Sequence, residues 1–206
     1  MGTKIYDCIR RIAERIIDNK DFLTDLDREI GDADHGVNMA RGFQAVLEKV
    51  PRDNANIGEV LKKTGMTLLS TVGGASGPLY GTAFMEAGKA AAGKESLEAG
   101  DVPVILNAVI AGIQKRGKAV RGEKTMLDAL IPAAESFTEK MEASSDLSEA
   151  MDAACAAARD GVEFTKTIRA TKGRASYLGD RSIGHQDPGA TSATLIMEAV
   201  RDFLRG

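Results

Sequence analysis

The sequence predicts an all-α fold, a closed antiparallel barrel or bundle of about eight amphipathic helices that forms one domain over residues 1–206. Apolar residues recur every three or four positions along most of the chain, as they do in helices that bury one face. No stretch alternates convincingly at a period of two, so strands are not expected. Aromatic residues make up 4% of the chain, tryptophan is absent and alanine is abundant, which is typical of closely packed helices.

Each helix is predicted from the spacing of the apolar residues within it. In chain order, the helices are expected over residues 5–16, 39–47, 57–69, 78–92, 103–113, 126–141, 148–168 and 190–204. Asn38 is the expected N-cap of the second helix and Ser148 that of the seventh, because short polar side chains accept the free N–H groups of a first turn. Pro78 and Pro103 are expected to open the fourth and fifth helices.

Four of the expected loops have an unusual composition, and they alternate with ordinary ones. The loops after the first, third, fifth and seventh helices, at 27–36, 70–77, 116–125 and 171–189, are rich in glycine and in charged or hydroxyl side chains. The intervening loops are plain polar connectors. Alternate loops lie at the same end of an up-and-down bundle. We therefore expect the four unusual loops to converge on one rim, provided that the helices are counted correctly.

The loop after the first helix carries three aspartates, Asp27, Asp32 and Asp34, and one glutamate within eight residues. Carboxylates this close repel one another unless a cation lies among them. Mg²⁺ and Ca²⁺ take oxygen ligands of this kind, and Gly31 and Gly36 allow the backbone to turn tightly. A solvated acidic turn is the alternative. The apolar residues between the acidic ones favour a metal site with the three aspartates as ligands.

The loop at residues 70–77 combines glycines with serine and threonine and precedes the fourth helix. Small residues let a phosphate approach the backbone, and a helix N-terminus offers it free N–H groups and partial positive charge. A close helix contact or a flexible turn would explain the glycines equally well. Together with the acidic loop, however, the pattern indicates a magnesium–nucleotide site.

Two standard motifs are excluded. Residues 88–95 (GKAAAGKE) resemble a phosphate-binding P-loop, but Glu95 stands where serine or threonine is required, and the segment is expected on a helix. If the acidic loop is aligned to a calcium-binding EF-hand from Asp32, Val37 replaces the required glycine and Phe43 the required glutamate.

Both histidines of the chain, His35 and His185, fall within unusual loops. A structural role is the alternative for each, but their shared location favours contact with phosphate or support of a metal ligand. A phosphohistidine carrier role for either one is a further alternative.

The last unusual loop contains Lys172 and Arg174, the expected cations of the site. Arginine can bind phosphate oxygens in a fork and neutralise charge during phosphoryl transfer.

The turn at 187–189 precedes the last helix, and Gly189 would allow close approach of a base or ribose. Met126 is expected either in the core or against an adenine ring.

Charge and hydropathy exclude several classes of protein. The net charge is −3 and no run of lysine or arginine occurs, so nucleic acid is not an expected partner. No apolar run is long enough to span a membrane, and Asp7 and Glu14 within residues 1–17 argue against a signal peptide. Cys8 and Cys155 form no CxxC pair, which favours small buried side chains in a reducing compartment, the cytoplasm.

Three long blocks of sequence coincide with the unusual loops and their flanking helices. They are LDREIGDADHGVNM at 26–39, GMTLLS with GGASGPLYGT at 65–82, and GRASYLG through SIGHQDPGAT at 173–191. In this order they closely resemble the nucleotide-binding L subunit of dihydroxyacetone kinase, and the resemblance extends over nearly the whole chain. It implies a barrel of eight antiparallel helices with the nucleotide at one rim.

The resemblance also implies the residues of the site. Asp27, Asp32 and Asp34 stand at the ligands of two Mg²⁺ ions that bridge the phosphates of ADP or ATP. The implied nucleotide contacts are His35, Gly36, Val37, Asn38, Ser76, Gly77, Gly117, Met126, Arg174, Asp187, Pro188 and Gly189. Arg174 is the expected catalytic residue.

The family transfers a phosphoryl group to dihydroxyacetone, which is bound covalently to a histidine of a separate K subunit. No substrate pocket or general base is therefore expected here. In one mode the L domain is fused to the K domain and ATP exchanges. In the other, a free L subunit keeps ADP bound, and a phosphohistidine subunit of the phosphotransferase system recharges it with phosphate derived from phosphoenolpyruvate. The size of this chain favours the second mode, and a homodimer is expected.

Two other functions remain possible at this point. One is a subunit of an ATP-dependent triose or tetrulose kinase. The other is a regulator that binds Mg²⁺ and a nucleotide without catalysis.

Overall fold

The computed structural model describes residues 3–206, and within them it contains nine α-helices, one 3-10 helix and no strand. The elements are α1 (Lys4–Asp18), α2 (Lys20–Ile30), α3 (His35–Lys49), α4 (Ile57–Thr71), α5 (Ser76–Ala90), α6 (Asp101–Gly117), α7 (Leu127–Ser144), α8 (Leu147–Thr167), the 3-10 helix η1 (Arg174–Ser182) and α9 (Pro188–Arg205). The predicted all-α class is confirmed. Residues 1 and 2 lie outside the described residues. They belong to the expected domain (1–206) and to the N-terminal segment (1–17) that was considered as a signal peptide.

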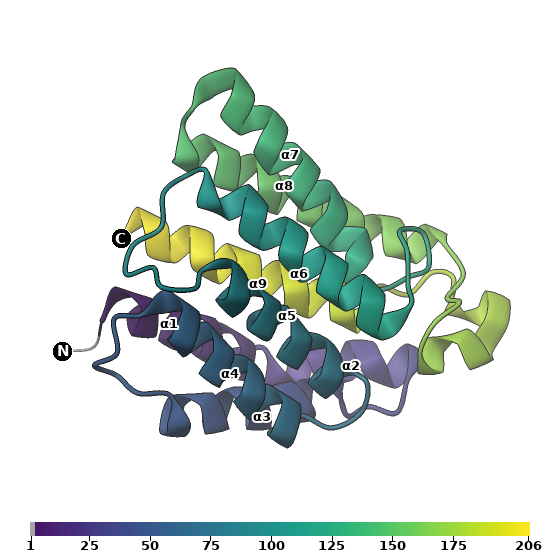
Figure 1. The fold of residues 1–206 in the computed structure, drawn as a ribbon. Helices are drawn as coiled ribbons and strands as arrows, with labels where there is room; N and C mark the ends of the chain where they lie inside the picture. Colours follow the sequence, from purple (N-terminus) through teal and green to yellow (C-terminus); the bar gives the residue numbers. More distant parts are fainter. Residues whose placement is uncertain (1–2) are drawn as a thin grey trace.

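Most helices pack against their neighbours in sequence (Figure 1). The exception is α9, which packs against helices from the beginning of the chain as well as against those that precede it. The tightest pairs are α4 with α5 and α7 with α8, while α3 lies against both α1 and α2. Helix α9 contacts α1, α2, α7 and α8, which brings the last helix back to the first and closes the arrangement. The short η1 projects near α2 on the right of Figure 1.

About eight helices were expected, and residues 20–30 add one more that no expected range covered, α2. Only Asn19 separates α2 from α1, and both helices run along the same side of α3 (Figure 1). The buried face of α2 is formed by Leu23, Asp27 and Ile30, so a carboxylate occupies a position that is usually apolar. Leu26 also packs against the core, so Asp27 interrupts an otherwise apolar face. Because α2 continues in the direction of α1, the alternation of the loops survives the miscount.

Several helix starts differ from the predicted ones. Asn38 lies inside α3, whose N-cap position is Asp34. Ser148 lies inside α8, where the cap is Asp146, whose side chain accepts a 3.0 Å hydrogen bond from the N–H of Glu149. Helix α5 begins two residues before Pro78, as the bounds above show.

The core is filled by alanine and branched aliphatic side chains, with Phe43 and Phe84 in edge-to-face contact at 6.1 Å between ring centres. Glycines bring α4 and α5 close together: a Cβ added at Gly65 would lie 2.6 Å from the carbonyl oxygen of Gly81. The P-loop-like sequence begins at Gly88 within α5, in this same close contact. Gly88 therefore serves helix packing, whereas Gly93 lies in the turn after α5 with a φ of +77°.

Burial raises the pKa of the Cys8 thiol to about 12 and that of Cys155 to about 11, so both stay protonated.

Across residues 3–206, no helix has both the length and the apolar character needed to cross a bilayer.

Candidate functional site

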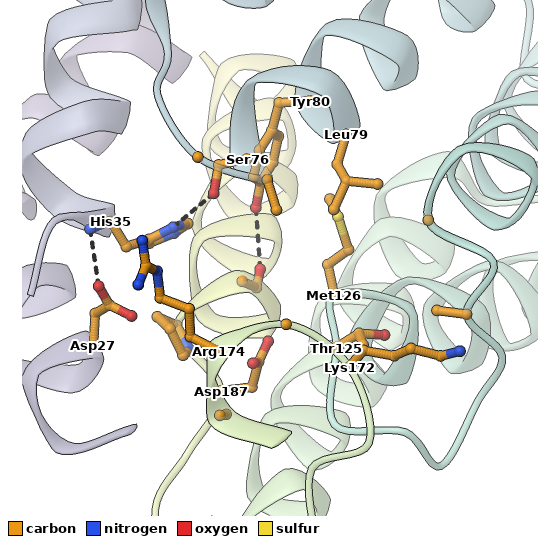
Figure 2. Close-up of a pocket in the computed structure, with 18 of the residues that line it drawn as sticks. Asp27, His35, Ser76, Leu79, Tyr80, Thr125, Met126, Lys172, Arg174 and Asp187 are labelled. Carbon is orange, nitrogen blue, oxygen red and sulfur yellow. Dashed lines mark hydrogen bonds between the residues drawn. The ribbon is translucent and has the colours of Figure 1, made fainter. Parts of the chain in front are cut away.

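The N-terminal ends of α3, α5, α7 and α9 meet at a cleft of about 440 Å³ (Figure 2). All four unusual loops contribute to its lining, for example through Asp34, Ser76, Thr125 and Arg174. The predicted convergence of these loops is therefore confirmed. Because each helix N-terminus carries partial positive charge and unpaired N–H groups, the cleft is suited to a ligand with several anionic oxygens.

The acidic cluster lies on one wall of this cleft. Asp27 projects from the last turn of α2 and is only 8% exposed. Its Oδ2 accepts hydrogen bonds from the N–H groups of Asp34 (2.9 Å) and His35 (3.1 Å), which ties the end of α2 to the start of α3. Asp27, Asp32 and Asp34 each offer one oxygen within 4.8 Å of the other two. This set of three oxygens fits a hard divalent cation.

Helix α5 presents an open N-terminus to the cleft. No side-chain N-cap hydrogen bond closes it among the residues that the structure describes. A Cβ added at Gly77 would lie 2.2 Å from the carbonyl oxygen of Val72, so glycine is needed for the chain to turn into the helix here. Gly74, just before, has a φ of +63°. The first turn of α5 therefore remains accessible to an anion.

His35 lies buried between α5 and α9. Its Nδ1 is 3.0 Å from Ser76 Oγ, and its Nε2 is 2.9 Å from Ser192 Oγ. Burial lowers the pKa of His35 to about 4, although the nearby charge of Asp27 acts in the opposite direction. The imidazole is therefore neutral near pH 7 and acts as a hydrogen-bonding group.

Positive charge reaches the cleft from η1 and from the loop before α7. Arg174 Nε lies 2.9 Å from Asp32 Oδ2 in an exposed ion pair, so the guanidinium stands beside the acidic cluster (Figure 2). Lys172 pairs with Glu123 at 3.6 Å. Lys124 is fully buried and donates to the backbone oxygens of Thr165 and His185.

Asp187 caps α9, because its Oδ2 accepts a 2.7 Å hydrogen bond from the N–H of Ala190. Burial raises the pKa of Asp187 to about 7, while that N–H group and the charge of Lys124 oppose the rise. A carboxyl group with this pKa can exist in either state at neutral pH, depending on the charge of its neighbours.

The structure places most of the predicted site residues in the lining of one cleft. These are Asp27, Asp32, Asp34, His35, Ser76, Gly117, Met126, Arg174, Asp187, Pro188 and Gly189.

The other predicted contacts lie in the first turns of α3 and α5, outside the lining. Gly36 faces α2, where an added Cβ would lie 2.0 Å from the carbonyl oxygen of Lys20. Val37 is 46% exposed. Asn38 Oδ1 accepts a 2.7 Å hydrogen bond from Arg41, and Gly77 stands against Val72. His185 is also outside the lining, and its Nδ1 is 3.8 Å from a carboxylate oxygen of Glu29.

The sequence analysis missed several residues of this site. Tyr80 and Lys124 line the cleft, and Ser192 lies directly behind His35. Leu79 and Ile113, together with the predicted Met126, form an apolar wall. Lys124 and Tyr80 lie within the loops and blocks already singled out, but only their burial marks them as more than surface or core residues.

The chain matches the family model described as the DAK2 domain over residues 29–202. It is 47% identical to the PEP-dependent dihydroxyacetone kinase, ADP-binding subunit DhaL, of Escherichia coli over 197 residues, which cover 95% of this chain and 94% of that subunit. It is 46% identical to the ADP-binding subunit DhaL of PEP-dependent dihydroxyacetone kinase 1 of Listeria innocua, with coverages of 91% and 89%.

Among solved structures, the native dihydroxyacetone kinase of C. freundii matches with a TM-score of 0.73 at 24% identity. The match covers 96% of this chain but only 34% of that kinase, so it establishes the fold alone. The same kinase has also been solved in complex with AMP-PNP and Mg²⁺. The resemblance inferred from the three sequence blocks is thus confirmed, and the chain belongs to the DAK2 domain family.

Proposed function

We propose that this chain is the ADP-binding subunit of a phosphoenolpyruvate-dependent dihydroxyacetone kinase. In this role a magnesium-bound nucleotide is a resident cofactor, and it relays a phosphoryl group from a phosphohistidine donor subunit to dihydroxyacetone on a K subunit. The observation that carries the proposal is the meeting of three aspartate oxygens and four helix N-termini in one cleft. The names of the relatives from E. coli and L. innocua support it.

In the proposed site, Asp27, Asp32 and Asp34 hold Mg²⁺, with two ions expected. When bound there, Mg²⁺ would neutralise the charge of the phosphate oxygens. The open first turn of α5 donates N–H groups to the same oxygens, and the hydroxyl of Ser76 lies beside them. Arg174 stands at the mouth and neutralises the charge that develops on the transferred group.

The rest of the cleft suits the nucleoside. Leu79, Ile113 and Met126 provide an apolar wall against which a flat base can pack. Gly117 belongs to the same wall, where a Cβ would lie 3.1 Å from Leu79 Cδ2. The first turns of α3 and α9 contribute the other proposed nucleotide contacts, His35 to Asn38 and Asp187 to Gly189.

The proposal leaves acceptor chemistry to the K subunit. His35 is enclosed by Ser76 and Ser192, so it is not assigned as the base of the reaction. A homodimer and a cytoplasmic location are part of the same proposal. The phosphohistidine-dependent mode is preferred because identity to the PEP- or PTS-dependent relatives is 40–47%, against 32–34% to triokinase/FMN cyclases and an L-erythrulose 1-kinase.

The test combines nucleotide retention with phosphoryl transfer. Native mass spectrometry after gel filtration should find ADP and Mg²⁺ on the wild-type protein. Asp32→Ala should lose both and keep its helix content by circular dichroism, whereas Asp21→Ala, an exposed carboxylate on α2, should retain them. Retention of ADP by Asp32→Ala would refute the metal assignment.

Transfer is then measured with K subunit, dihydroxyacetone and the phosphohistidine donor. Dihydroxyacetone phosphate should form with this donor. Steady turnover with ATP alone would indicate the ATP-dependent mode, and absence of product with either donor would indicate a non-catalytic regulator.

A further inference from the structure

A buried lysine joins three segments of the chain in the wall of the cleft. The ammonium group of Lys124 donates to the carbonyl oxygen of Thr165, at 2.5 Å, and to that of His185. The carbonyl oxygen of Ile168 lies 3.5 Å from the same nitrogen. Lys124 is 1% exposed and belongs to the loop before α7, whereas its partners belong to the end of α8 and to the loop before α9. One side chain therefore connects segments that are 41 to 61 positions apart in sequence.

The backbone at Lys124 is held in a conformation that lysine seldom adopts. Its φ is +61°, in the left-handed region, where residues with a Cβ are uncommon. The buried carboxylate of Asp128 holds this turn, because it accepts hydrogen bonds from the N–H of Gly122 and, at 2.8 Å, from that of Thr125. A conformation of this kind persists only where its surroundings fix it. The turn and the burial together keep the lysine side chain directed into the protein.

Thr165 holds the loop before α9 from the side of α8. Its side chain is fully buried, and its Oγ1 accepts a 2.9 Å hydrogen bond from the N–H of Asp187. The same hydroxyl donates to the carbonyl oxygen of Val162 at 2.6 Å. The N–H of Gly184 also donates to the carbonyl oxygen of Lys166, at 2.7 Å. Together with the lysine contact, these hydrogen bonds fix the loop on the C-terminal end of α8.

The fixed loop leads directly into the first turn of α9, which adjoins the apolar wall of the cleft. A Cβ added at Gly189 would lie 3.8 Å from the Cβ of Met126, so these two lining residues are in van der Waals reach. Met126 follows Lys124 by two residues, and Gly189 follows Asp187 by two residues. The buried lysine and Thr165 therefore restrain both sides of this contact.

We propose that Lys124 and Thr165 are positioning residues that hold the first turn of α9 against Met126 and thereby shape the part of the cleft that receives the nucleoside. The inference rests on the proposed nucleotide site and adds two residues that were not among its expected contacts. Both act through the backbone of residues 185–187, to which their polar atoms are bonded. Without them this loop would shift, while the three aspartates and the first turn of α5 at the phosphate end would stay in place.

The test uses Thr165→Val, which keeps the shape of the side chain but leaves the N–H of Asp187 without its acceptor. The affinity for ADP, measured by calorimetry on nucleotide-free, full-length protein with Mg²⁺, should fall about tenfold, because a loop that has lost a buried hydrogen bond must be reordered when the nucleoside binds. Thr165→Ser keeps the hydroxyl and should bind ADP like the wild type. Inorganic pyrophosphate with Mg²⁺ has no nucleoside, so it should bind Thr165→Val as it binds the wild type. Lys124→Met should show the same split between ADP and pyrophosphate.

Thr64→Val is the matched control. Thr64 is also fully buried, and its hydroxyl donates to the carbonyl oxygen of Val60 in its own helix, at 2.9 Å. This variant should keep the wild-type affinity for ADP. An unchanged ADP affinity in Thr165→Val and Lys124→Met, each shown to be folded by circular dichroism, would overturn the inference, as would equal losses for ADP and pyrophosphate. Failure of the wild type to bind ADP with Mg²⁺ would instead refute the proposed function.

Discussion

The carboxylate of Asp27 occupies the space that a side chain at residue 31 would need. A Cβ added to Gly31 would lie 2.0 Å from Asp27 Oδ1 and 3.0 Å from the Asp27 carbonyl oxygen. Asp27 can therefore turn over the end of α2 and accept the N–H groups of Asp34 and His35 only because residue 31 is glycine. The glycine of the acidic loop thus serves the orientation of one carboxylate as well as the turn of the backbone.

The first prediction follows from this contact. Gly31→Ala should displace the Asp27 carboxylate. The affinity for Mg²⁺ in the presence of ADP should then fall by roughly 10- to 100-fold, as expected when a metal ligand loses its orientation. Calorimetric titration of Mg²⁺ in the presence of ADP measures this. Gly100→Ala is the control, since an added Cβ there meets nothing within 4 Å. Equal Mg²⁺ dependence in the two variants would contradict the role assigned to Gly31.

The second prediction concerns Arg174. Arg174→Gln should reduce phosphoryl transfer to dihydroxyacetone by about 100-fold or more, because a charge that stabilises the transition state is lost. ADP affinity should change much less, since the aspartates and helix N-termini remain. Transfer is assayed with the K subunit and the phosphohistidine donor. Arg181→Gln on the same 3-10 helix, an exposed arginine, should be near wild type. A similar loss in both variants would indicate a general effect of charge at η1.

The third prediction concerns Lys124, whose ammonium group lies 2.5 Å from the carbonyl oxygen of Thr165 and also donates to that of His185. It thereby joins the end of α8 to the loop before α9. Lys124→Met should leave these buried oxygens without a donor and lower the free energy of unfolding by about 1–3 kcal/mol. Urea denaturation measures the change. Lys63→Met, at an exposed position on α4, should have little effect. Unchanged stability in Lys124→Met would mean that water replaces the ammonium group.

The fourth prediction is a pH dependence set by Asp187, whose pKa rises to about 7 in the folded protein. The folded state holds this proton more tightly than the unfolded chain, so the stability that Asp187 contributes is complete below about pH 4 and is lost as the pH rises through about 7. Each unit of pKa difference corresponds to about 1.4 kcal/mol.

Asp187→Asn keeps an oxygen to cap α9 but removes the titration. Without Mg²⁺ and nucleotide, the wild type should therefore lose more stability than Asp187→Asn between about pH 5 and pH 8. Urea denaturation of both proteins at the two pH values provides the comparison. A parallel decline in both would assign the pH dependence to other groups.

Local sequence information was sufficient for the fold class and for the general position of the site. Helical periodicity, the scarcity of aromatic residues and the glycine-rich loops are properties of neighbouring residues, so they are visible before the chain folds. The alternation of plain and unusual loops then located the cleft, because antiparallel helices return every second loop to the same end. Helix α2, which the sequence analysis missed, has Asp27 on its buried face, where an apolar residue is usual.

Only the tertiary structure decided which side chains meet. His35 and Ser192 are 157 positions apart in sequence, and Tyr80 and Ser192 are 112 apart, yet they form adjacent links in one hydrogen-bonded chain. Ser192 belongs to no pattern that marks it locally, and Lys124 stands in an unusual loop but is distinguished there only by its burial. Burial and hydrogen-bond partners arise from packing between helices. The sequence by itself determined an all-helical chain with its acidic and glycine-rich turns at one rim. Packing decided the contacts within that rim, since they depend on the ångström-scale approach of helices that are distant in sequence.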